Sequence, residues 1–382
     1  MNLTDVLEQI REPDRAVAAE TQRRLDRLTK PQGSLGRLEE LAVQYCAITR
    51  ECKPAVPRGT VFTFAADHGV VDEGVSAYPR DVTAQMVLNF LRGGAGVNVL
   101  GRHSNVEIRV VDIGVAHDFG AIAGLIHRKL MMGTRNMLHA PVMDRPTAQQ
   151  ALLVGIELAA DAVRQGIGLI GTGEMGIGNT TASAAIVAVM TGAAVDSVTG
   201  RGTGLDEQGR ARKIAVIEQA LASHRPNPHD AVDVLSKVGG LEIAAMAGLI
   251  LGGAAAEVPV VLDGFIAGAA ALIAVGLQPR CREYMMALVG AVQVATESKT
   301  AMLIQNNVRS IARKSLLATG TGTDVVVVAS SLEGLLKLPY SGTHTEIGSM
   351  IGRLVAQCVQ RGLIRATRRS RVRSRRTRPR SL

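Results

Sequence analysis

The chain has 382 residues, 47% of them hydrophobic and only 2% aromatic, so its length allows two or three domains whose cores pack small aliphatic side chains around 41 glycines. The net charge of +9 equals the charge of the nine arginines in residues 365–382, so the rest of the chain is neutral. This distribution argues against a basic nucleic-acid-binding surface, because the tail also lacks aromatic side chains for base stacking. We expect the tail, which contains arginine, serine and threonine but little apolar surface, to be disordered.

The cysteines and the apolar segments indicate where in the cell the protein works. Cys46, Cys52, Cys281 and Cys358 follow no zinc or redox spacing, so we expect reduced thiols and neither a metal nor a cofactor. The N-terminus has no apolar signal core, and apolar runs of ~18 residues are broken by polar side chains. We therefore expect a cytoplasmic protein without membrane spans.

In chain order, the first elements are helical. Residues 4–28 form a charged amphipathic pattern with Thr4 as a plausible N-cap, a turn-rich loop covers residues 30–36, and a second helix is expected at 37–49. Short β-branched runs then predict buried strands at 61–66, 106–113, 167–170 and 258–262. Helical patterns separate them, near 80–100, 146–165, 179–192, 209–223 and 239–255. This alternation predicts an α/β fold with a mostly parallel sheet flanked by helices.

The pattern changes after residue 284. Residues 285–318 do not continue the strand–helix alternation, although a strand is expected at 324–329 and a helix near 345–360. We accordingly divide the chain into a small helical N-terminal region (1–50), an α/β domain (51–283), an atypical C-terminal segment (285–364) and the arginine-rich tail (365–382).

Polar residues follow each of the first four predicted strands. Asp67 and His68 follow the first, Asp112 ends the second, and Asp263 follows the fourth. Because ligands of open α/β sheets bind beyond the carboxyl ends of the strands, these residues predict one active-site edge. His68 is either a base or, as we favour, a loop histidine held by hydrogen bonds.

The third strand leads into a glycine-rich turn at 171–176 (GTGEMG), which fits the G-x-G-x-x-G pattern of a phosphate-binding helix start. A nicotinamide cofactor is disfavoured because the acid expected ~20 residues on, Asp196, follows no strand. Residues 176–181 (GIGNTT) suit a monophosphate better, although a tight turn without a ligand remains open. A second glycine loop at 200–206 precedes Lys213, which is either a point charge for that phosphate or part of a solvated helix face.

Five stretches carry a specific resemblance in collinear order: 30–36 (KPQGSLG), 64–85 (FAADHGVVDEGVSAYPRDVTAQ), 133–137 (GTRNM), 173–181 (GEMGIGNTT) and 239–263 (GGLEIAAMAGLILGGAAAEVPVVLD). Over residues 1–283 the chain resembles the nicotinate-nucleotide:dimethylbenzimidazole phosphoribosyltransferase family. The resemblance implies a Rossmann-like sheet with a small helical domain, a homodimer, and metal-free transfer of phosphoribose from nicotinate mononucleotide to 5,6-dimethylbenzimidazole.

The resemblance also implies site residues. Ser76, Tyr78 and Gln85 are expected near the benzimidazole, and Glu174 at the ribose hydroxyls. The residues expected around the phosphate are Gly176, Gly178, Asn179, Thr180 and Lys213, and we add Asp263 to the substrate-binding set.

The catalytic residue remains unassigned. In the family, the glutamate that takes the benzimidazole proton lies in a C-terminal Gly-Glu-Gly-Thr-Gly segment, which this sequence lacks. Three other glutamates, Glu297, Glu333 and Glu346, have none of the expected flanking glycines. We therefore predict a protein that still binds its substrates but whose catalytic activity is impaired.

The segment at 285–364 resembles something else. Residues 296–301 (TESKTA), 319–324 (TGTGTD) and 341–348 (SGTHTEIG) are similar to the C-terminal part of adenosylcobinamide amidohydrolases. Thr321, Asp324 and His344 are candidates for hydrolytic chemistry there. A salvage amidohydrolase or a bifunctional fusion is therefore the alternative function.

Overall fold

The computed structural model describes residues 2–287. The predicted strand at 324–329, the predicted helix near 345–360 and the arginine-rich tail lie outside the described residues. The strands are β1 (Arg58–Ala66), β2 (Glu107–Gly114), β3 (Leu125–His127), β4 (Ile167–Met175), β5 (Val260–Leu262) and β6 (Met285–Ala287). The helices are α1 (Leu3–Gln9), α2 (Arg15–Asp26), α3 (Arg37–Thr49), α4 (Val82–Leu91), α5 (Gly96–Ser104), α6 (Arg145–Arg164), α7 (Asn179–Thr191), α8 (Val195–Val198), α9 (Glu207–His224), α10 (Ala231–Val238), α11 (Leu241–Ala255) and α12 (Phe265–Leu277), with 3₁₀ turns η1 (Gly69–Glu73) and η2 (Pro279–Tyr284).

The six strands form one parallel sheet in the order β3-β2-β1-β4-β5-β6, which confirms the predicted α/β class. The first strand, β1, lies in the middle and pairs with β2 on one side and β4 on the other. From β1, the strands β2 and β3 extend the sheet on one side, and β4, β5 and β6 then extend it on the other. Folds with this order bind ligands beyond the carboxyl ends of the strands where the direction reverses, here β1 and β4.

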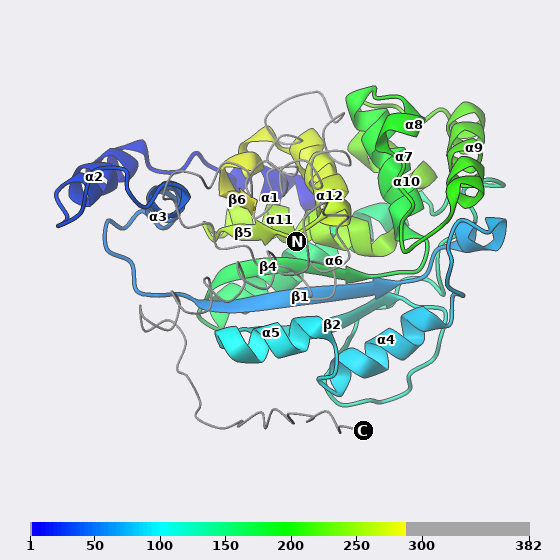
Figure 1. Ribbon diagram of the computed structural model, residues 1–382, viewed down its shortest axis with the longest axis horizontal. Coiled ribbons are helices and arrows are strands. Elements are labelled where there is room, and N and C mark those ends of the chain that lie inside the picture. The colour runs from blue at the N-terminus through cyan, green and yellow to red at the C-terminus, as the bar shows by residue number, and fades with distance from the viewer. Residues whose placement is uncertain (1, 288–382) are drawn as a thin grey trace, which may run out of the picture. The chain divides into compact units, whose positions relative to one another are not determined.

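Helices cover both faces of the sheet. In Figure 1, α4 and α5 lie on one face, and α6, α11 and α12 lie on the other. The close approach of α6 and α11 depends on glycine: a Cβ on Gly155 would lie 1.9 Å from the carbonyl oxygen of Ala245, and a Cβ on Gly248 would lie 1.9 Å from that of Leu152. Backbone contact of this kind lets helices pack closely in a core that is poor in aromatic side chains.

Several predicted elements are divided in the structure. The helix expected at 4–28 is two helices, because Pro13 lacks a backbone N–H and Asp14 caps α2 by accepting from the N–H groups of Ala16 and Val17. The N-cap of α1 is Asn2 rather than Thr4. The helix expected near 80–100 ends at Leu91 and restarts at Gly96, and the one expected at 239–255 is preceded by a separate helix, α10. The sequence analysis did not predict β3, β6 or α12.

Candidate functional site

Polar side chains converge at the carboxyl ends of the central strands. Glu174 pairs in register with Phe64 of β1, so it lies beside the end of that strand, where Asp67 and His68 follow. Asp67 and His68 are buried, and Asp263 follows β5 at the exposed rim. Residues that are far apart in the sequence therefore share one edge of the sheet, as the strand ends predicted.

The end of β2 does not belong to this group. Asp112 is fully buried and accepts a hydrogen bond from the backbone N–H of Val115 at 3.0 Å, while Lys129 lies 3.1 Å from its other carboxylate oxygen. Lys129 also donates to the carbonyl oxygens of Val115 and His117. These contacts close the loop after β2, which gives Asp112 a structural role.

The turn from β4 into α7 requires its glycines. A Cβ on Gly176 would lie 2.5 Å from the carbonyl oxygen of Ala66, and Gly178 has φ +93°, with Val71 only 2.7 Å from the position of its missing Cβ. The N-cap of α7 is Gly178, and no side chain of the described residues makes a capping hydrogen bond there. The turn therefore presents a bare helix N-terminus, whose N–H groups and partial positive charge favour a phosphate.

We expect Gly178→Ala to lower the free energy of unfolding by about 3 kcal/mol, because the left-handed backbone and the overlap with Val71 both disfavour alanine. Gly192, at the other end of the same helix, has φ +71° but nothing within 4 Å of a Cβ. It therefore supplies a matched control: Gly192→Ala should lower the free energy by about 1 kcal/mol. Urea unfolding of both variants measures the difference, and equal effects would show that the turn is not tightly packed.

Lys213 of α9 is a buried cation beside this turn. Its side chain is 1% exposed, and its Nζ donates to Thr180 Oγ1 at 2.7 Å. Among residues 2–287, no carboxylate oxygen lies within 4.0 Å of it, and burial lowers its pKa to about 8. A buried ammonium without an acidic partner is unfavourable, so this arrangement suits an anionic ligand. The alternative of a solvated helix face is wrong.

The second glycine loop completes the surroundings of Lys213. A Cβ on Gly202 would lie 3.4 Å from Lys213 Nζ and 3.2 Å from Thr180 Oγ1, and Gly202 has φ +54°. The loop thus passes its backbone directly over the lysine. The two glycine-rich segments of the sequence meet at one ammonium group.

Glu174 is the titratable group at the centre of the edge. It is half-buried and accepts a hydrogen bond from the side-chain amide of Asn179. Burial, together with the charges of Glu242 and Asp263, raises its pKa to about 7. Asp263 itself accepts from its neighbour's N–H, that of Gly264, at 2.9 Å and from the hydroxyl of Thr172 at 3.5 Å.

His68 is held by a carboxylate that sequence analysis did not single out. Its Nε2 lies 2.6 Å from Glu242 Oε1, and the two side chains are 1% and 0% exposed. Burial disfavours the imidazolium, but the charges of Glu242, Asp67 and Glu174 outweigh burial and raise the pKa of His68. The favoured interpretation, a histidine held by hydrogen bonds, agrees with this geometry. The signal in the sequence was an acid, Glu242, within an otherwise apolar helix.

The residues expected near the benzimidazole lie on the segment leading into α4. Ser76 Oγ accepts from the N–H of Tyr78 at 3.2 Å, Tyr78 is half exposed, and Gln85 is exposed on α4. The same helix is tied to the glycine turn, because Thr83 Oγ1 accepts from the N–H of Ile177 at 3.1 Å. None of the hydrogen bonds found within residues 2–287 links these three side chains directly to Glu174 or Lys213.

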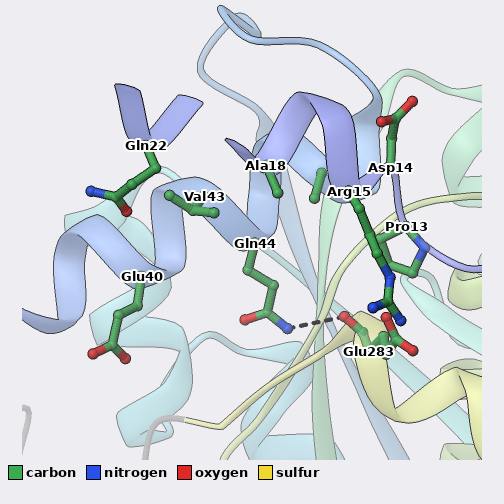
Figure 2. Close-up of a pocket in the computed structure, with 10 residues that line it drawn as sticks. Pro13, Asp14, Arg15, Ala18, Gln22, Glu40, Val43, Gln44 and Glu283 are labelled. Carbon is green, nitrogen blue, oxygen red and sulfur yellow. Dashed lines mark hydrogen bonds between the residues drawn. The ribbon is translucent and has the colours of Figure 1, made fainter. Parts of the chain in front are cut away.

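A surface hollow of about 450 Å³ lies elsewhere, between α2, α3 and η2 (Figure 2). The hydrogen bond drawn there joins Gln44 Nε2 to the carbonyl oxygen of Glu283 at 3.0 Å. In Figure 1, α2 and α3 lie at the opposite end of the sheet from α7 and α9. The hollow lacks the glycine turn and the buried lysine, so we place no substrate in it.

Two further expectations concern metals and thiols. Within residues 2–287, no group of three or more His, Cys, Asp or Glu side chains is arranged to hold a metal ion. Cys46, Cys52 and Cys281 are free thiols, and Cys358 lies outside the described residues. The described helices include none with the length and apolarity needed to cross a membrane.

Comparison with known proteins gives the site its context. The profile of a phosphoribosyltransferase family matches residues 10–289, about three-quarters of the chain. The chain belongs to this phosphoribosyltransferase family. The resemblance predicted for residues 1–283 is thereby confirmed, and the enzyme class with it. A second profile, that of adenosylcobinamide amidohydrolase, matches residues 275–371, which confirms the resemblance predicted for the C-terminal segment.

Individual relatives agree with the family. The chain is 58% identical over 292 residues to the nicotinate-nucleotide–dimethylbenzimidazole phosphoribosyltransferase of Geobacter sulfurreducens, covering 76% of this chain and 83% of the relative. It is 49% identical over 352 residues to the protein of the same name from Geobacter metallireducens, covering 92% and 99%. The crystal structure of CobT from Thermus thermophilus is 45% identical and superposes with a TM-score of 0.69, covering 71% of this chain and 81% of that one.

Proposed function

We propose that this phosphoribosyltransferase transfers the phosphoribosyl group of nicotinate mononucleotide to 5,6-dimethylbenzimidazole, releasing nicotinate and forming α-ribazole 5′-phosphate. The observation that carries the proposal is the buried ammonium of Lys213, which has no carboxylate within 4.0 Å among residues 2–287 and donates to Thr180 at the start of α7. The names of its relatives from Geobacter sulfurreducens and Geobacter metallireducens support the same donor and acceptor.

The geometry supports a position for each part of the donor. The phosphate would lie at Lys213 and at the start of α7, where Gly176, Gly178, Asn179 and Thr180 supply backbone and hydroxyl groups. The ribose would follow at Glu174, whose carboxylate accepts hydrogen bonds from sugar hydroxyls, with Asp263 on its far side. The half-buried position of Glu174 leaves it open to such a ligand.

The acceptor would lie between this edge and the segment leading into α4. Met175 ends β4 and, like Ala84 and Met86 of α4, packs against the buried cluster that includes Ala65 and Val87. Apolar side chains there suit the flat benzimidazole ring, and Ser76, Tyr78 and Gln85 on the same segment would supply its polar and aromatic contacts.

The reaction requires one proton to leave. A benzimidazole nitrogen forms a bond to the anomeric carbon, the bond from that carbon to the pyridine nitrogen breaks, and its electron pair stays on nicotinate. The other ring nitrogen then loses its proton to a base. The glutamate that serves the family is missing from this sequence, and Glu297, Glu333 and Glu346 lie outside the described residues. We therefore propose that the chain binds its donor well and turns over slowly.

Calorimetry with two ligands tests the binding half of this proposal. Nicotinate mononucleotide should bind, and nicotinate riboside, which differs only in lacking the phosphate, should bind about 100-fold more weakly, because a charge-assisted contact to a buried ammonium is lost. Equal affinities would place the phosphate away from Lys213.

Two finer points accompany the proposal. We propose that the enzyme works in the cytoplasm as a homodimer, for which light scattering should give twice the chain mass of 40.2 kDa. The match at residues 275–371 is to the amidohydrolase family, and the motifs quoted from the sequence resemble the C-terminal part of that family. We therefore keep cobinamide cleavage as the alternative, and an assay of the purified chain for amide cleavage of cobinamide would detect it.

A further inference from the structure

The imidazole of His68 is enclosed by backbone from two turns. A Cβ on Gly176 would lie 3.3 Å from His68 Cδ2 and Nε2, and a Cβ on Gly178 would lie 3.4 Å from its Cβ. On the other side, a Cβ on Gly240 would lie 2.5 Å from His68 Cε1. The ring therefore packs directly against the turn before α7 and the turn before α11, with no room for intervening side chains.

Glu242 fixes the ring in this position. Its Oε1 lies 2.6 Å from His68 Nε2, and its carboxylate is fully buried in the first turn of α11, where the helix dipole favours an anion. A Cβ on Gly240 would also lie 2.8 Å from Glu242 Oε2. Removing one member of such a buried pair leaves the other as an uncompensated group, which usually loses its charge.

We propose that His68 and Glu242 form a positioning pair, which supports the Gly176–Gly178 turn from beneath and keeps Glu174 turned toward the ribose of the donor. The assignment of Glu174 to the ribose rests on the proposed function. Both side chains of the pair are buried, and the backbone of Gly176 lies against the imidazole ring, so we assign the pair no direct contact with substrate. It acts through Glu174, which lies two residues before Gly176 and accepts a hydrogen bond from the side chain of Asn179, the residue after the turn.

The pair also acts on Glu174 electrically. Within the described residues, the charges that act on Glu174 are those of Glu242 from α11, Asp263 from the end of β5 and His68 from the end of β1. The charge of Glu242 raises the pKa of Glu174 more than the charge of His68 lowers it. Substituting either member by a neutral residue should remove the charge of both. The pKa of Glu174 should therefore fall below about 7 in every variant of the pair.

Carbon NMR of the full chain labelled at glutamate Cδ measures this directly. The resonance of Glu174 is the one missing from Glu174→Gln, and in the native protein it should titrate near pH 7. In His68→Gln, in Glu242→Gln and in the double variant, the midpoint should move to lower pH by the same amount. His224→Gln is the matched control, because within residues 2–287 the hydrogen bond of its ring is to the carbonyl oxygen of Met137, at 2.8 Å, and it should leave the midpoint unchanged.

The outcomes separate positioning from simple structural support. Unchanged midpoints in both single variants, or shifts that add in the double variant, would overturn the proposal, even if the melting temperature falls. Affinity for nicotinate mononucleotide should fall about tenfold in either single variant and no further in the double. The titration needs no substrate, so a native protein that failed to bind the nucleotide would contradict the proposed function and leave this test intact.

Discussion

Replacing Lys213 with methionine should weaken binding of nicotinate mononucleotide by about 100- to 1,000-fold, because the phosphate would lose the ammonium group of Lys213, the only buried Lys or Arg side chain among the described residues. Methionine keeps most of the length of the side chain, so the change removes the charge with little loss of packing. Calorimetry at pH 7 measures the effect.

The same variant should make the unliganded protein more stable. Burial lowers the pKa of Lys213 from 10.5 to about 8. Below pH 8 both states carry the proton, and the folded state is disfavoured by about 3 kcal/mol. Between pH 8 and 10.5 the unfolded chain binds the proton and the folded chain does not, so stability should rise with pH in that window. Lys213→Met should abolish this rise.

A matched lysine controls for the loss of charge as such. Lys237 of α10 is partly exposed and paired with Asp233 at 2.9 Å, and it lies outside the proposed site. Lys237→Met should therefore leave affinity unchanged and the window between pH 8 and 10.5 unaffected. If Lys213→Met bound the nucleotide normally, or destabilised the unliganded protein, the phosphate would have to be placed elsewhere.

Turnover should be slow. We expect nicotinate release about 10²- to 10⁴-fold below that of the Geobacter sulfurreducens relative assayed in parallel, because loss of a general base typically reduces rates by that factor. Chromatography of nicotinate formed from nicotinate mononucleotide and dimethylbenzimidazole gives the rate.

A small carboxylate in solution tests the cause. Added formate should accelerate this chain in a saturable manner, since its sequence lacks the glutamate segment that the family resemblance leads us to expect, and it should leave a relative that carries this segment unaffected. Chloride at the same ionic strength is the control. A rate equal to that of the relative without formate would mean that another residue already serves as the base.

The parallel sheet followed from sequence because strands buried on both faces are uninterrupted β-branched runs, and helices separate them. The breaks at Pro13 and at Gly93 also had local signals, which a pattern drawn over 20 residues overlooked. In contrast, β3 and β6 have only three residues each. Their edge positions depend on contacts with β2 and β5 rather than on any local pattern.

The site divides along similar lines. The glycine turn and Glu174 could be predicted because a helix N-terminus after a strand needs small residues. For Lys213 the residues alone left two interpretations open, and the resemblance favoured the phosphate contact. The burial of Lys213 excludes a solvated helix face, and burial depends on tertiary packing that the sequence pattern does not show. Glu242 stood out only as an acid in an apolar helix, and its pairing with His68 could not be predicted, since His68 lies 174 positions earlier and the two meet only when α11 packs on the sheet.

The most direct measurement is the identity of the products formed from nicotinate mononucleotide and dimethylbenzimidazole at high enzyme concentration with formate present. Mass spectrometry should find nicotinate and α-ribazole 5′-phosphate in equal amounts, and neither should form with Lys213→Met at the same donor concentration. Nicotinate accompanied by ribose 5-phosphate, or an unconsumed donor, would contradict phosphoribosyl transfer at this site.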